Sequence, residues 1–227
     1  MMKLLASLLS ALLLTIGTAH AQTEPAAAEP APAPPPELVR VVLNTEMGPI
    51  ILHLDKTNAP VTTGNFLRYV DEKRLDGTVF YRAMHLEWGT PPNGLIQGGT
   101  QNDPKRELPP IAHEPTNLTG IRHKTGTISM ARYAPGTATG DFSIMLAPQP
   151  GLDAMPDAED AEAQAGFAAF GQVVEGMETV RAIFNAPISQ TKGEGWMRGQ
   201  MIEKPVKILT AHRAPMPAPA PVPEPVP

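Results

Sequence analysis

The sequence predicts a mainly β domain, because it combines many short strands, regular breaks between them and few helices. Runs rich in β-branched and aromatic residues follow one another, each bounded by glycine or proline. Two other segments show helical periodicity. These observations are typical of a closed antiparallel barrel capped by helices, but strand propensity alone does not separate a barrel from a sandwich. The central runs are Thr78–Ala83, Gly94–Gln97, Thr127–Ala131, Asp141–Leu146 and Phe167–Val174.

Strands at the two ends of the folded part complete this set. Leu38–Asn44 and Ile50–Asp55 are β-branched runs separated by Glu46-Met47-Gly48-Pro49, a spacing that predicts a hairpin. Val206–Thr210 predicts a last strand. The chain should therefore begin and end its domain with β structure.

Two helices are expected. The first begins at Ala59-Pro60-Val61, where the missing N–H of proline costs nothing in the first turn, and it ends before the turn dipeptide Asp76-Gly77. The second covers Met177–Phe184, in which apolar residues recur on one face.

The first 21 residues have the pattern of a secretory signal peptide. Lys3 supplies a positive start, Leu4–Ile16 a short apolar run, and Ala19-His20-Ala21 an A-x-A cleavage site. The mature chain should begin near Gln22. Because the apolar run is too short for a comfortable membrane span, we expect export to the periplasm or the medium rather than membrane insertion.

Composition limits the remaining classes. Residues 22–37 and 214–227 are rich in alanine and proline and cannot bury enough surface to fold, so one domain is expected over residues 38–213. The net charge of −5, without a block of Lys or Arg, argues against a nucleic-acid surface. Cysteine is absent, so the fold cannot depend on disulfides or thiolate-bound metal. We expect a monomer.

Five motifs in the folded part, taken together, resemble in order the strand motifs of the cyclophilin-type peptidyl-prolyl isomerases. The resemblance covers nearly all of residues 39–210. It implies a closed barrel of about eight strands and an enzyme that acts on X-Pro bonds of proline-containing polypeptides. The motifs are Phe80-Tyr81-Arg82, Ile96-Gln97-Gly98-Gly99, Gly126-Thr127-Ile128-Ser129-Met130-Ala131-Arg132, Asp141-Phe142-Ser143-Ile144 and Phe170-Gly171-Gln172-Val173.

The chemistry that the resemblance implies needs no metal, nucleophile or cofactor. Rotation about a peptide bond breaks amide resonance and costs about 18–20 kcal/mol. In the twisted amide the proline nitrogen regains its lone pair, so a fixed donor aimed at it stabilises the transition state more than either ground state. Arginine is suited to this task because it stays charged and its planar fork can hold two acceptors.

The resemblance assigns Arg82 as the catalytic arginine and Gln97 as the glutamine that orients the peptide backbone. Without the flanking motifs, Arg82 could equally be a surface arginine in an ion pair. Gln97 could be an ordinary strand glutamine with satisfied hydrogen bonds.

The other substrate-binding positions form the predicted groove. Ala131 and Arg132 fall where the family lines it, Leu95 and Leu152 fall at two apolar pocket positions, and Phe167 falls at the rim. For the two leucines, core packing is the alternative.

Two further groove positions depart from the family pattern. Asp141 replaces a backbone-binding glutamine, and Ser143 replaces the phenylalanine at the pocket floor. Gly94 also replaces a pocket aromatic residue. We expect Asp141 to face Arg82 as an ion pair, which would lower the pKa of the carboxyl.

Two segments of the predicted domain are long, and the link between Arg82 and Gln97 is longer than is usual in the family. Trp88, in the link before Gly94, could lean over the groove or pack locally. The acidic segment 149–165 is expected to be a solvated loop, with calcium or partner binding as the alternative. The histidines show no metal-binding spacing, so no metal is expected.

The sequence thus favours an exported prolyl isomerase that assists protein folding. The alternative is a catalytically weak module of the same fold that binds proline peptides as a chaperone or scaffold. Asp141 and Ser143 favour the alternative.

Overall fold

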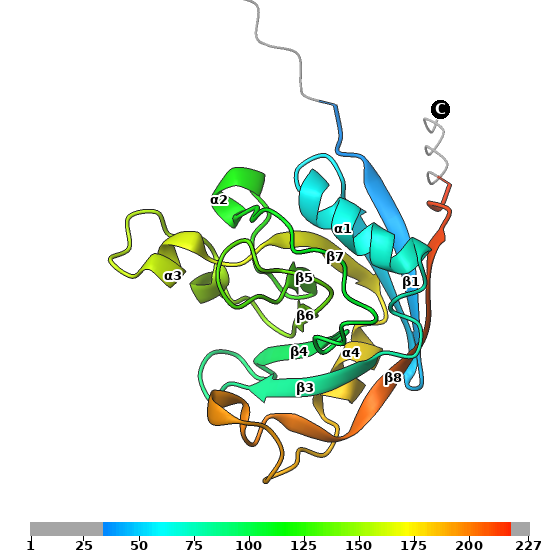
Figure 1. Cartoon of the computed structure of the whole chain (residues 1–227), viewed down its shortest axis with the longest axis vertical. Coiled ribbons are helices and arrows are strands. Elements are labelled where there is room, and N and C mark those ends of the chain that lie inside the picture. Colours follow the sequence, from blue (N-terminus) through cyan, green and yellow to red (C-terminus); the bar gives the residue numbers. More distant parts are fainter. Residues whose placement is uncertain (1–33, 219–227) are drawn as a thin grey trace, which may run out of the picture. The chain divides into compact units, whose positions relative to one another are not determined.

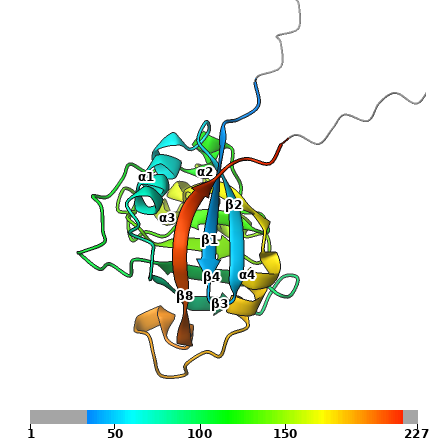
Figure 2. The same cartoon turned by 90° about the vertical axis from the view of Figure 1, so that its right-hand side faces the viewer.

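A computed structural model describes residues 34–218 of the chain. Within this range, eight strands form a closed antiparallel barrel in the order β1-β2-β7-β5-β6-β4-β3-β8 (Figures 1 and 2). The predicted mainly β barrel is therefore confirmed. The strands are β1 (Leu38–Thr45), β2 (Gly48–Asp55), β3 (Val79–His85), β4 (Gly94–Gly99), β5 (Thr127–Met130), β6 (Phe142–Met145), β7 (Ala169–Glu175) and β8 (Met201–Ala214).

The signal peptide and most of both proline-rich segments lie outside the described residues, so those expectations stay predictions. The last strand ends at Ala214, one residue beyond the expected end of the domain. Within residues 34–218, no helix has the length and apolar character needed to cross a membrane.

The β1–β2 hairpin forms as predicted, with Thr45 opposite Gly48. The Thr45 hydroxyl donates to the Gly48 carbonyl at 2.7 Å and accepts from the Met47 amide at 3.1 Å. Gly48 has a φ of 125°, a backbone conformation that side-chain-bearing residues rarely adopt. The turn therefore depends on glycine at this position.

The two predicted helices lie at opposite ends of β2. The first, α1 (Pro60–Asp71), follows Asp55 and is tied to its carbonyl by the Thr63 hydroxyl at 2.8 Å. The second, α4 (Met177–Phe184), packs near the Gly48 end and has the predicted bounds. Two short helices were not predicted, namely α2 (Thr116–Thr119) and α3 (Ala161–Ala165).

A distant carboxylate caps α1. The Glu114 side chain accepts hydrogen bonds from the amides of Val61 and Thr62 at 3.1 and 2.6 Å, and from the Thr62 hydroxyl at 2.6 Å. Free amides at a helix start attract negative charge, so this buried glutamate is stabilised there. The contact fixes the segment between β4 and β5 against the helix.

Strand β8 is longer than predicted and closes the barrel by pairing with both β1 and β3. It begins at Met201, which lies opposite Arg82, whereas Val206 lies opposite Phe80. The ladder is therefore irregular around Pro205, which has no N–H to donate. That proline is the reason why the sequence pattern shows only the later part of the strand.

Four phenylalanines form the centre of the core. Phe66 of α1 lies 5.3 Å from both Phe142 and Phe170, and Phe142 lies 5.7 Å from Phe80, measured between ring centroids. All four rings are fully or almost fully buried. The Phe66–Phe142 and Phe80–Phe142 pairs meet edge to face, an arrangement that stabilises a core beyond simple burial.

We predict that Phe66→Ala lowers the free energy of unfolding by about 3–5 kcal/mol, because it leaves a cavity between α1 and the barrel. Urea unfolding with an unchanged m-value would measure this loss. Leu118→Ala, at an exposed α2 position, is the control and should change stability by no more than about 0.5 kcal/mol. Equal effects of the two variants would contradict the assigned core.

Candidate functional site

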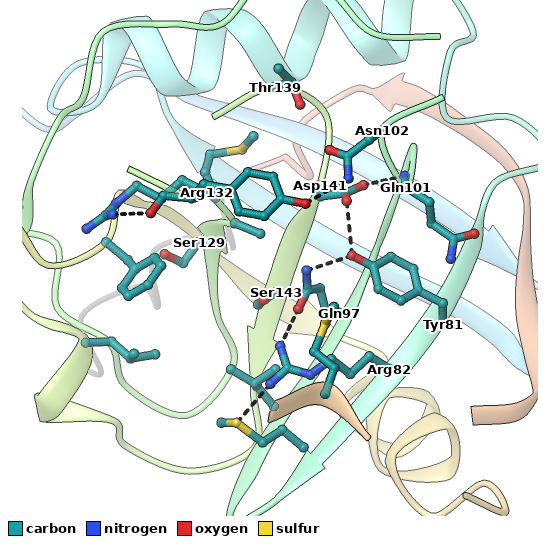
Figure 3. Close-up of a pocket in the computed structure, with 18 of the residues that line it drawn as sticks. Tyr81, Arg82, Gln97, Gln101, Asn102, Ser129, Arg132, Thr139, Asp141 and Ser143 are labelled. Carbon is teal, nitrogen blue, oxygen red and sulfur yellow. Dashed lines mark hydrogen bonds between the residues drawn. The ribbon is translucent and has the colours of Figure 1, made fainter. Parts of the chain in front are cut away.

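A pocket of about 640 Å³ opens over strands β3, β4, β5 and β6 (Figure 3). The structure brings all of the predicted site residues to its lining, although lining does not test their individual roles. These residues are Arg82, Leu95, Gln97, Ala131, Arg132, Asp141, Ser143, Leu152 and Phe167.

An irregularity in β3 places two consecutive side chains in this pocket. Side chains of a regular strand alternate between its faces, yet Tyr81 and Arg82 both line the pocket. The register of β3 shifts between Phe80 and Arg82 against both of its neighbours. A bulge re-aims side chains in this way, and here it adds a tyrosine beside the arginine.

Arg82 and Gln97 are cross-strand partners and form the centre of the site. They lie opposite each other on β3 and β4, and Nη1 of Arg82 donates to Oε1 of Gln97 at 2.6 Å. Arg82 is 4% exposed. Burial lowers its pKa to about 10, so the guanidinium remains charged through the neutral range.

A chain of hydrogen bonds leads from this pair across the pocket (Figure 3). Nε2 of Gln97 donates to the Tyr81 hydroxyl at 2.6 Å, and this hydroxyl donates to Oδ2 of Asp141 at 3.0 Å. Oδ1 of Asp141 accepts from the Gln101 amide at 2.8 Å. The hydroxyl therefore separates the carboxylate from the arginine.

The expected Arg82–Asp141 ion pair is wrong. The hydrogen bonds that Arg82 makes within the described residues go to Gln97, Gln200 and the sulfur of Met84. The pKa of Asp141 is raised, not lowered, chiefly because burial disfavours the charged form, and the Gln101 amide offsets only part of this effect. The prediction failed because it assumed direct contact between strands and overlooked the intervening Tyr81.

The opposite end of the pocket is built around Arg132 and Phe167. The guanidinium of Arg132 lies 4.6 Å from the centre of the Phe167 ring, and its Nη2 donates to the Gly166 carbonyl at 2.6 Å. Nη1 forms an ion pair with Glu162 of α3 at 2.7 Å. One acidic residue of the segment 149–165 thus has a specific partner at the pocket rim.

A buried histidine supports the wall that carries Leu152. Nδ1 of His123 lies 2.8 Å from Oδ1 of Asp153, and Nε2 lies 2.8 Å from the Ser129 hydroxyl. Burial is the largest influence on the His123 pKa and lowers it, which favours the neutral ring. The contacts join β5 to the segment containing Leu152.

Several lining residues were not found from the sequence. Trp88, the tryptophan considered for the groove, is 67% exposed and does not line the pocket. Trp196 does line it, and its ring centre lies 4.5 Å from the guanidinium carbon of Arg82. Nothing in the local sequence around Trp196 marks this contact. The other residues missed include Met84, Met130, Met145, Met197 and Met201.

Metal ligands are not grouped in the described part of the chain. Among residues 34–218, no group of three or more His, Cys, Asp or Glu side chains could hold an ion.

Comparison with known proteins adds independent findings. Residues 40–213 match the model of the family described as cyclophilin type peptidyl-prolyl cis-trans isomerase. A peptidyl-prolyl cis-trans isomerase of Acinetobacter baylyi is 35% identical over 174 residues, which cover 75% of this chain and 82% of the relative. Peptidyl-prolyl cis-trans isomerase A of Dickeya dadantii is 37% identical over 147 residues, covering 63% and 70% of the two chains.

Solved structures agree with the fold. A cyclophilin type isomerase of Cryptosporidium parvum aligns with a TM-score of 0.61 at 18% identity, covering 80% of this chain and all of that one. A second structure of that protein, in the presence of the dipeptide Ala-Pro, has a TM-score of 0.60 at 19% identity and covers 78% and 99% of the two chains. At these identities the likeness concerns the fold alone.

We predict that the free energy of unfolding of Asp141→Asn increases relative to that of wild type as the pH rises from about 3 to 7. The folded pKa of Asp141 is raised, so below the unfolded pKa both states are protonated and no penalty exists. Above it, wild type loses stability as the pH rises through the folded pKa. Asparagine has no such dependence.

Urea unfolding across this range measures the stability difference between the two proteins. Asp157→Asn, in the exposed acidic segment, is the control and should not show this trend. If wild type instead gained stability relative to Asp141→Asn as the pH rises, the result would contradict the inferred destabilisation of the buried carboxylate.

Proposed function

The chain belongs to the cyclophilin-type peptidyl-prolyl cis-trans isomerases, and we propose that it assists the folding of exported proteins by isomerising their X-Pro bonds. The single observation that carries the proposal is the Arg82–Gln97 pair, which presents a buried charged donor inside a largely apolar pocket.

Arg82 would act on the amide itself. As the X-Pro bond twists, its nitrogen regains a lone pair, and a guanidinium already in place stabilises that charge distribution without reorganising. Gln97 both accepts from Arg82 and donates to Tyr81, so its amide orientation is determined by two partners. The pair would hold the donor at a constant angle to the substrate.

The apolar wall would hold the proline ring. Leu95, Leu152, Met130 and Phe167 line the pocket, and gripping the ring makes the preceding part of the substrate the part that turns. Ser143 provides a polar floor in place of a ring. Proline-containing polypeptides are therefore the proposed partners, bound through apolar contact at the ring and hydrogen bonds along the backbone.

Export is supported by the sequence of residues 1–21 alone. Their positive start, apolar run and A-x-A site have the pattern of a cleaved signal, which supports the proposal that the activity lies in the periplasm or outside the cell. A monomer is proposed as well. X-Pro isomerisation takes tens of seconds uncatalysed, so newly exported chains would gain from an isomerase there.

We predict that Arg82→Ala reduces isomerisation of an Ala-Pro peptide by about tenfold or more, because the donor to the twisted nitrogen is removed. A protease-coupled assay measures this rate, and circular dichroism checks the fold. Arg82→Lys should also lose rate because it keeps the charge but lacks the planar fork. Arg68→Ala, on the exposed side of α1, is the control. Wild-type turnover by Arg82→Ala would refute the mechanism.

The proposed role and location have their own test. The purified protein should accelerate the refolding of a secreted protein whose slow phase is X-Pro isomerisation, and Arg82→Ala should not. N-terminal sequencing of the protein recovered from the periplasm or medium should start near Gln22. Retention of residues 1–21 on a cytoplasmic product would overturn the location and leave the isomerase activity standing.

A further inference from the structure

Two residues outside the five family motifs also contact the guanidinium of Arg82. Nε and Nη2 of Arg82 both donate to Oε1 of Gln200, at 2.8 and 2.7 Å. The ring of Trp196 lies against the guanidinium, 4.5 Å from its carbon to the ring centre. Both residues belong to the segment 185–200, here called the α4–β8 loop.

Gln200 connects every part of this arrangement. Its carbonyl accepts from the Ala83 amide at 2.9 Å, which fixes its backbone beside β3. Its side-chain oxygen accepts from Arg82, and its side-chain nitrogen donates to the Trp196 carbonyl at 3.0 Å. One amide group thus orients both the guanidinium and the residue that covers it.

The base of the loop is anchored to the start of β8. The Ser189 amide donates to the Met201 carbonyl at 2.8 Å, and the Glu203 amide donates to the Pro187 carbonyl at 2.7 Å. Lys192 forms an ion pair with Glu203 at 3.3 Å. The position of Gln200 is therefore determined by the barrel, and this makes it a fixed acceptor for Arg82.

Most N–H groups of the Arg82 guanidinium have an acceptor among the described residues. A guanidinium has five N–H groups. Gln200 accepts a hydrogen bond from the Nε–H group and another from one N–H group of Nη2. The sulfur of Met84 accepts from the second N–H group of Nη2 at 3.2 Å, and Gln97 accepts from one N–H group of Nη1. Within the described residues, one N–H of Nη1 has no acceptor. The plane of the guanidinium and the direction of its remaining donor are thus both defined.

We propose that Gln200 and Trp196 are positioning residues, which hold Arg82 so that its remaining N–H is directed at the twisted X-Pro nitrogen. This inference depends on the proposed isomerase mechanism. Neutral acceptors suit the role because they orient the guanidinium without cancelling its charge. The tryptophan excludes water from one face and adds a cation–π contact.

The first test measures kcat and KM separately with an Ala-Pro peptide. Gln200→Ala should lower kcat about tenfold with little change in KM, because the arginine remains but loses its orientation. Trp196→Ala should lower kcat about threefold, and Trp196→Phe should restore most of it. The matched controls are Gln172→Ala and Trp88→Ala, which alter residues of the same types outside the pocket lining.

The second test asks whether Gln200 acts through Arg82. In an Arg82→Ala background, Gln200→Ala should cause no further loss of rate. The NMR signal of the Arg82 Nε–H should also exchange faster with water in Gln200→Ala than in wild type. An additional loss in the double variant, an unchanged exchange rate, or a wild-type kcat for Gln200→Ala would each overturn the positioning role.

These outcomes separate the two proposals. If Arg82→Ala keeps wild-type turnover, the isomerase mechanism itself fails. If Arg82→Ala is impaired while Gln200→Ala and Trp196→Ala behave like their controls, the mechanism stands and only the positioning role fails.

Discussion

The shift in register of β3 at Tyr81 is the constraint on which the site depends. Phe80 and Ala83 are fully buried in the core, whereas Tyr81 and Arg82 line the pocket on the other face. A regular strand places residues i and i+2 on the same face, so it could not point Phe80 inward and Arg82 outward. The irregular pairing with β4 and β8 resolves this conflict. The core and the pocket can therefore share one strand.

Because Arg82 is largely buried, its N–H groups need hydrogen-bond acceptors from the protein, and these acceptors must not neutralise its positive charge. A carboxylate in direct contact would stabilise the charge but would also compete with the substrate. The structure instead surrounds Arg82 with amide oxygens and a thioether, from Gln97, Gln200 and Met84. Asp141 is connected to Arg82 through Tyr81 and Gln97 and not by direct contact. Uncharged acceptors on β3, on β4 and at the end of the α4–β8 loop leave the donor charged and limit its orientation.

Local patterns predicted the strands and the two main helices, because alternation and turn residues are properties of short segments. The positions that gather in one pocket were predicted from the family resemblance of the strand motifs. Contacts that depend on long-range geometry were not predictable in the same way. Trp196 lies against Arg82 because β8 begins at Met201, opposite Arg82. Pro205 interrupts the strand pattern, so the sequence did not show where β8 begins. The Asp141 prediction failed because no local signal shows that the Tyr81 hydroxyl, from the same strand as Arg82, lies between Gln97 and Asp141. The roles of the pocket residues remain predictions until variants are measured.

The composition of the pocket wall bears on which substrates can be held. Ser143 lies opposite Gln97 on one side and Ser129 on the other, so this part of the pocket is polar. Apolar contact must then come from the surrounding side chains, among which methionines are frequent. A methionine has three rotatable bonds and a polarisable sulfur, so it can adjust to ligands of different shape at small energetic cost. Under the proposed mechanism, rigid positioning would be concentrated at Arg82, and adaptability would be concentrated at the pocket wall. We expect this division to favour chemistry common to all X-Pro bonds over strict recognition of the neighbouring residues.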